Sequence, residues 1–135
     1  MSELSKSLGA MEYDGLIADI NPKLVVSGGT LRKLGAAGTI KRGTILAKSG
    51  GTEGDNKLVA LGTAASGDTE TLTAYAILCD DVEVGTTDDV TVPVYLAGCF
   101  NLNKCVTIND HTITEAEKDA LRNGGIFFKA AAPAL

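Results

Sequence analysis

The chain has 135 residues and a mass of 13.9 kDa, a length that fits one folded domain and leaves little room for two. Apolar residues make up 44% of it, which excludes a disordered polymer. Seventeen acidic against twelve basic residues give a net charge of −5, which disfavours generic binding to nucleic acid or to an anionic membrane surface. The apolar stretches are short and interrupted by glycine, so no membrane-spanning helix is expected.

Residues 1–22 differ in character from the rest and are predicted to form an N-terminal arm. Apolar residues at positions 4, 8 and 11 have helical spacing, but Gly9 and Gly15 each weaken a helix by about 1 kcal/mol. The sequence therefore supports a flexible or extended arm and a helix equally. The segment has no basic-then-apolar signal region, so we expect the protein to be made in a cytoplasm and not exported. The remaining residues, 23–135, are predicted to form a β-rich domain.

Short strands separated by glycine-containing turns dominate this second part. The clearest one alternates apolar and polar residues between Leu72 and Leu78. Pro93 cannot donate a ladder hydrogen bond, so its strand is expected at an edge or with a bulge there. Polar, glycine-rich stretches at 48–56 and 63–69 are expected to be exposed loops. The predicted strands cover Lys23–Val26, Thr44–Ala47, Lys57–Leu61, Leu72–Leu78 and Val90–Leu96.

One helix has a clear start and stop. Thr114 and Glu117 have the spacing of a capping box, in which each side chain binds a backbone N–H of the first turn. Gly124 is expected to supply the left-handed residue that ends the helix, so the helix is predicted over about Glu115–Asn123. A short apolar strand follows at 126–128. The predicted fold class is mainly β, with this one short helix near the C-terminus.

Catalytic and metal chemistry has few candidate residues. The single histidine, His111, could pair with Cys79 or Cys105, but neither thiol lies in a recognisable nucleophile motif. Cys99, Cys105 and His111 are each separated by five residues, whereas paired zinc cysteines prefer two to four. An odd number of cysteines also argues against a closed disulfide framework, so the thiols are expected to be reduced and buried.

The other chemical patterns are weaker. A group of carboxylates follows the Leu72–Leu78 strand, but it lacks the calcium-loop spacing and is expected to be a solvated acidic face. The glycines form no phosphate-binding loop, and the tyrosines lack the arginines of a base-stacking platform. We therefore predict no catalytic, cofactor or metal site and favour a structural or binding role. The carboxylates are Asp80, Asp81, Glu83, Asp88 and Asp89.

Four segments carry a family resemblance through their order and spacing. They are Lys41–Leu46, Ala74–Val82, Val92–Asn101, and the predicted helix with the Gly125–Lys129 strand behind it. Together they cover about residues 39–129 and resemble the head decoration proteins of tailed bacteriophages, which include the lambdoid capsid-stabilising protein and related head fibre proteins. The long N-terminal region and the polar 48–56 loop depart from the family pattern.

The resemblance implies a small β-tulip-like fold that assembles as homotrimers. Such trimers sit on the outer surface of the mature, expanded capsid at local three-fold positions. There they clamp neighbouring coat subunits and resist the outward pressure of packaged DNA, while N-terminal arms help to grip the shell. The implied partners are the major capsid protein and further copies of the chain, with no cofactor, nucleic acid or membrane.

Contact residues can be suggested for both kinds of partner. The residues suggested for capsid contact have an equally supported alternative role as an ordinary first strand of the core. In an arm, the burial of three of their apolar side chains, at about 1.5–3 kcal/mol each, would offset the free-energy cost of ordering the arm on binding. For the trimer interface we expect the less buried face of the Val90–Leu96 strand and its continuation, namely Tyr95 and Ala97. The capsid-contact candidates are Tyr13, Leu16, Ile17 and Ile20.

Three other functions remain open at this stage. The first is another virion component, such as a tail-tube or fibre-base protein, for which a hexameric ring would be typical. The second is a small ligand- or carbohydrate-binding β domain, although the six aromatic residues include no tryptophan for stacking on sugars. The third is a cysteine-dependent enzyme, which requires a thiol of low pKa.

Overall fold

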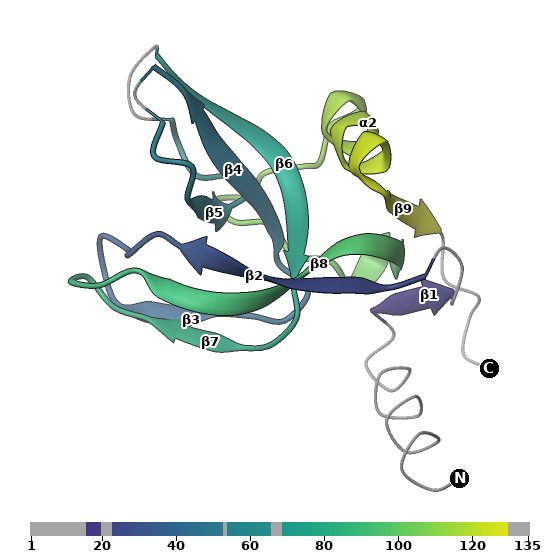
Figure 1. Ribbon diagram of the computed structural model, residues 1–135, viewed down its shortest axis with the longest axis horizontal. Coiled ribbons are helices and arrows are strands. Elements are labelled where there is room, and N and C mark those ends of the chain that lie inside the picture. The colour runs from purple at the N-terminus through teal and green to yellow at the C-terminus, as the bar shows by residue number, and fades with distance from the viewer. Residues whose placement is uncertain (1–15, 20–22, 53, 66–68, 130–135) are drawn as a thin grey trace, which may run out of the picture.

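The computed structural model describes residues 16–19, 23–52, 54–65 and 69–129, and these confirm the mainly β fold with one α-helix near the C-terminus (Figure 1). None of the helices in these ranges has the length and apolar character needed to cross a bilayer. The elements are β1 (Ile17–Asp19), β2 (Val25–Leu31), β3 (Gly38–Ile40), β4 (Ile45–Gly51), β5 (Leu58–Ala60), β6 (Glu70–Leu78), β7 (Val82–Val84), β8 (Val90–Asn101), a 3₁₀ helix η1 (Leu102–Lys104), α2 (Glu115–Gly124) and β9 (Ile126–Lys129).

Five strands form a small barrel-like sheet in the order β8-β2-β5-β4-β6, and β6 returns to pair with β8. The neighbours are antiparallel except β2 and β5, which are parallel and share a single register pair, Leu31 with Leu58. The backbone N–H of Arg32 adds a hydrogen bond of 2.9 Å to the Leu58 carbonyl. The seam between β2 and β5 is therefore the shortest backbone contact in the barrel.

Side chains reinforce this seam. Arg32 donates to Asp55 at 3.0 Å and to Glu70 at 2.6 Å, and the Glu70 side chain is only 1% exposed. Ser49, which is fully buried, also donates to Glu70 at 2.5 Å. Lys57 pairs with an aspartate outside this group at 2.5 Å. The ends of β2, β4 and β6 are thus joined by a partly buried network of charged hydrogen bonds.

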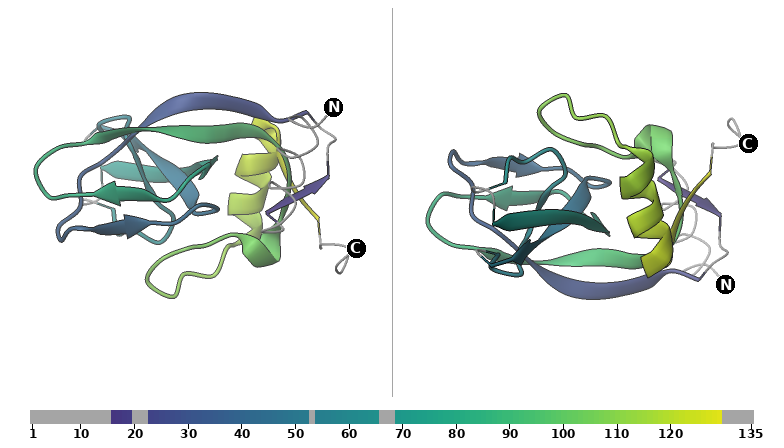
Figure 2. Two further views of the ribbon diagram at one scale, coloured as in Figure 1. Left: turned by 90° about the horizontal axis from the view of Figure 1, so that it is seen from below. Right: turned by 90° about the horizontal axis from the view of Figure 1, so that it is seen from above.

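β8 is the longest strand and extends beyond the barrel. Its last residues, Gly98–Asn101, pair with β9 in parallel, while Phe100 and Cys99 also pair with β1 in antiparallel fashion. β1 and β9 therefore flank the same end of β8, and α2 lies across that end of the barrel (Figure 2). β3 and β7 form a separate two-stranded ribbon.

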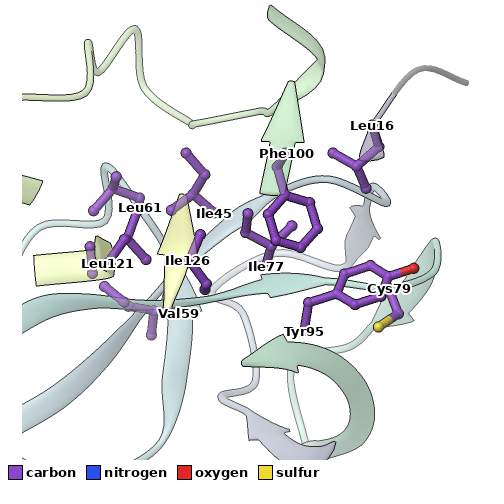
Figure 3. Packing of buried hydrophobic residues seen from close by; sticks show 12 residues of the cluster. Leu16, Ile45, Val59, Leu61, Ile77, Cys79, Tyr95, Phe100, Leu121 and Ile126 are labelled. Atoms are coloured by element: carbon purple, nitrogen blue, oxygen red, sulfur yellow. The ribbon is translucent and has the colours of Figure 1, made fainter. Parts of the chain in front are cut away.

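The core has two clusters because the middle of the sheet is covered on both faces. Ile77 is fully buried in one cluster, with Phe100, Leu121 of α2 and Ile126 of β9 (Figure 3). The alternation in Leu72–Leu78 predicted Ile77 on the polar face, and this is wrong because a register shift between β4 and β6 turns Ile77 to the buried face that also carries Ala74. The second cluster contains Leu31, Leu46, Leu58, Leu78, Val84 and Val94.

Two predicted boundaries also differ from the structure. The stretch predicted as an exposed loop from residue 48 is β-strand as far as Gly51, because Ser49 is buried against Glu70 rather than solvated. The strand predicted at Lys23–Val26 begins later and runs on to Leu31. Pro93 lies just beyond the point where β6 stops pairing with β8, so one side of β8 has no strand partner there among the described residues.

The predicted capping box of the helix is present. The Thr114 hydroxyl accepts from the Glu117 N–H at 3.2 Å, and the Glu117 carboxylate accepts from the Thr114 N–H at 2.8 Å. The predicted stop is one residue early, because Gly125 rather than Gly124 takes the left-handed conformation, with φ of 111°. A Cβ on Gly125 would lie 3.2 Å from the Cβ of Ala97, so the turn packs closely against β8 and favours glycine at this position.

Candidate interaction surface

The expected capsid anchors fall partly outside the described residues. Tyr13 and Ile20 lie there, whereas Leu16 is 2% exposed and packs next to Phe100 in the core (Figure 3). The Leu16 carbonyl accepts from the Asn101 N–H at 2.7 Å, and Ile17 pairs with Phe100. The described part of this segment, 16–19, is therefore a first strand of the folded body. As a correction, the Leu16 side chain is not available for contact with a coat protein.

Tyr95 was expected on an exposed face, and this is also wrong. It is 4% exposed, its ring lies 5.2 Å from that of Phe100, and its hydroxyl accepts from Arg42 at 2.9 Å. Burial raises the pKa of Tyr95, against the opposing effect of Arg42. Ala97, by contrast, is half-buried opposite Val25 of β2. Only Ala97 of the two suggested interface residues lies near the surface.

Arg42 joins three of the segments that carry the family resemblance. Its guanidinium donates to the Cys79 carbonyl at 2.7 Å and lies 5.7 Å from the centre of the Tyr95 ring. Its backbone N–H donates to Asp81 at 2.7 Å. From the sequence, Arg42 was predicted only as part of a bend. Its role in joining these segments could not be predicted, because its partners lie 37 to 53 residues away.

Two of the three thiols lack the low pKa that a nucleophile needs. Burial raises the pKa of Cys79 to about 11 and that of Cys105 to about 12, whereas a reactive cysteine has a lowered pKa. His111 instead packs against the start of α2, where its Nε2 lies 2.8 Å from a Glu117 oxygen. Partial burial opposes ionisation of Glu117, but hydrogen bonds from Thr114 and His111 outweigh it and lower the pKa. Within the described ranges, no group of three or more metal-ligating side chains occurs.

The surface of the described part includes two hollows. The larger, about 290 Å³, lies between α2 and β9 beside Phe127. Its two basic side chains, Lys118 and Arg122, are paired with acidic residues of the same helix. The second is about 140 Å³ and is lined mainly by apolar residues at the β2–β5 side of the barrel. Pockets that hold small-molecule ligands usually measure roughly 300–1,000 Å³, so the first hollow is at the lower limit of that range and the second is well below it.

Exposed apolar side chains gather on the strands beside Ala97. Val25 and Val26 of β2 are 46% and 57% exposed, and Phe127 of β9 is 39% exposed. Their pairing partners lie close together on β8, since Val25 and Val26 pair with Ala97 and Tyr95, and Phe127 pairs with Cys99. These strands therefore form the candidate interaction surface. The sequence showed the Val25-Val26 pair but not its exposure, because exposure depends on which other elements pack there, and none of the described residues covers the pair.

No protein-family model matches the chain, and no curated protein matches it significantly.

Proposed function

We propose that the chain is a capsid decoration protein of a tailed bacteriophage. In this role it binds as a homotrimer at local three-fold positions on the outer surface of the mature head and stabilises the shell against the pressure of packaged DNA. Its partners are the major capsid protein and two further copies of itself. The proposed role uses no cofactor, nucleic acid or membrane.

The observation that carries the proposal is the way in which the four resembling segments meet. The start of β4 pairs with β6, β6 pairs with β8, and β8 pairs with β9. Leu121 of α2 is buried in the same cluster as residues of these strands. Segments that resemble one family in order and spacing thus also make one continuous packed unit, which supports their common origin over a chance likeness of separate strands.

The physical character of the body suits a clamp. Among the described residues, no buried side-chain nitrogen or oxygen lacks a hydrogen-bond partner, so the core has no polar defect that would weaken it. A trimer that touches several coat subunits at once gains strength through effective concentration, even when each contact is modest. The net charge of −5 also suits a position outside the shell, away from the DNA phosphates.

The direct test uses expanded shells of the same virus that were assembled without this protein. Purified protein is added, free and bound fractions are separated by sedimentation, and the shells are imaged by electron microscopy. We expect saturable binding with new density at local three-fold positions, and decorated heads should retain DNA better under osmotic shock. Shells that remain bare at saturating protein would refute the proposal, and a hexameric ring in solution would favour a tail-tube component.

A further inference from the structure

β2 has one paired edge and one open edge. All seven of its residues pair with β8, whereas on the other side only Leu31 has a strand partner, Leu58 of β5. Over Val25–Thr30, called the β2 edge below, the other side meets no strand among the described residues. Figure 2 shows this strand along the outside of the molecule, with β8 on its inner side.

The β2 edge lacks the usual protection against pairing with another chain. Natural edge strands are kept short, or carry lysine, proline or bulges. β1 and β9 follow this rule, since they have three and four residues and β9 ends at a lysine. The seven residues of β2 include no charge and no proline, and the irregular register with β8 is confined to its first pair, Val25–Val26.

The side chains of the β2 edge leave room for a neighbour. Val25, Val26, Ser27 and Gly28 are all exposed, and a Cβ built on Gly28 would meet nothing within 4 Å. No packing within the described residues therefore requires glycine at this position. A strand approaching from outside would meet small or β-branched side chains and no charge.

We propose that the β2 edge receives an extended, uncharged segment of the coat protein, which adds a strand to the sheet beside β2. This inference rests on the proposed function and assigns one of its contact surfaces. Main-chain hydrogen bonds would hold the added strand, as in other cases of strand addition, and Val25 and Val26 would supply apolar contact. The residues of the β2 edge carry no charge, so an uncharged strand would not have to desolvate a charged side chain of this edge.

The size of the edge favours the coat protein over a second copy as the occupant. Six residues span about 20 Å at ~3.3 Å per residue, and a single strand of that length buries far less than the roughly 1,200 Å² typical of stable two-protein interfaces. Two copies joined only through this edge would separate in solution. A trimer that offers three such edges to one shell would stay bound, because each contact raises the effective concentration of the others.

The test compares shell binding by the wild type, by the double variant Val26→Lys/Ser27→Lys and by the control Thr39→Lys. Both sites of the double variant are exposed, and Thr39 is an exposed strand residue on the separate β3–β7 ribbon. We expect the double variant to bind expanded shells at least tenfold more weakly and the control within twofold of wild type. Hydrogen exchange of the outward-facing β2 amides in the wild type should slow at least tenfold on docking, a readout that does not depend on variant folding.

The outcomes separate this inference from the function on which it rests. If wild-type protein ignores the shells, both fail. If it binds them while the double variant binds equally well and β2 exchange is unchanged, the coat strand is excluded and the decoration role stands. Slow β2 exchange in the free protein, or a loss of self-association in the double variant, would identify another segment of the chain or a second copy as the occupant and overturn the inference.

Discussion

The seam between β2 and β5 offers the sharpest test of what holds the barrel together. We predict that Arg32→Met destabilises the protein by about 2–3 kcal/mol. The substitution keeps most of the apolar stem but leaves the Glu70 carboxylate, with its side chain 1% exposed, without its guanidinium partner at 2.6 Å. Breaking a buried ion pair from one side costs about 3–5 kcal/mol, and the lower figure here allows for the 24% exposure of Arg32 and for the remaining Ser49 hydrogen bond.

The neighbouring positions set an expected order of effects. Glu70→Gln removes the buried charge and keeps an acceptor for Ser49, so we expect a smaller loss of about 1–2 kcal/mol. Asp55→Asn should cost under about 1 kcal/mol, because that carboxylate is 37% exposed and solvent screens the pair. Arg122→Met is the matched control, since Arg122 pairs with Asp119 on the exposed face of α2 and should change stability by less than about 0.5 kcal/mol.

The assay is equilibrium unfolding in urea, which is uncharged and does not screen ion pairs as guanidinium does. All variants are measured at one protein concentration, because dissociation of an oligomer would otherwise shift the midpoints. Equal slopes are needed before the free energies of unfolding are compared. A loss below about 0.5 kcal/mol for Arg32→Met, or a larger loss for Asp55→Asn than for Arg32→Met, would refute the view that the buried Glu70 makes this seam important.

Three further predictions concern pH, a turn and the thiols. The hydrogen bond from Arg32 holds the pKa of Asp55 at about 2, so the stabilisation by the Asp55 carboxylate should be complete above about pH 4 and fade toward pH 2. Urea unfolding should therefore show the difference in free energy of unfolding between wild type and Asp55→Asn shrinking as the pH falls from about 4 to about 2, and a constant difference would contradict this prediction. Gly125→Ala should lower stability by about 1–2 kcal/mol in thermal unfolding, because a left-handed alanine is strained and its Cβ would crowd Ala97; an unchanged melting temperature would argue against this geometry. Cys79 and Cys105 should react with iodoacetamide at neutral pH at least tenfold more slowly in the native than in the urea-unfolded protein, since burial raises both pKa values; rapid native alkylation would reopen the cysteine-enzyme alternative.

Local patterns predicted those parts of the protein whose partners are close in the sequence. The capping box of α2 was predicted because Thr114 and Glu117 are three residues apart and satisfy each other's backbone groups. The strands around Leu72–Leu78 and Val90–Leu96 were predicted because alternation and turn residues act within a few positions. The mainly β class follows from the sum of such segments.

Distant contacts decided the rest. Ser49 is polar and glycine-flanked, so it was predicted to lie in a loop, yet Glu70, 21 residues on, satisfies it inside a strand. Leu16 was a candidate for capsid contact or for a first core strand, and Tyr95 was a candidate for the trimer interface. Phe100 packs against both, and Arg42 reaches the Tyr95 hydroxyl from 53 residues away. Among the described residues one side of β2 meets no strand over Val25–Thr30, and the sequence alone could not show this, because an edge is defined by which strands pair with it in the fold. A sequence records the preference of each residue, whereas its burial depends on neighbours that only the folded chain brings together.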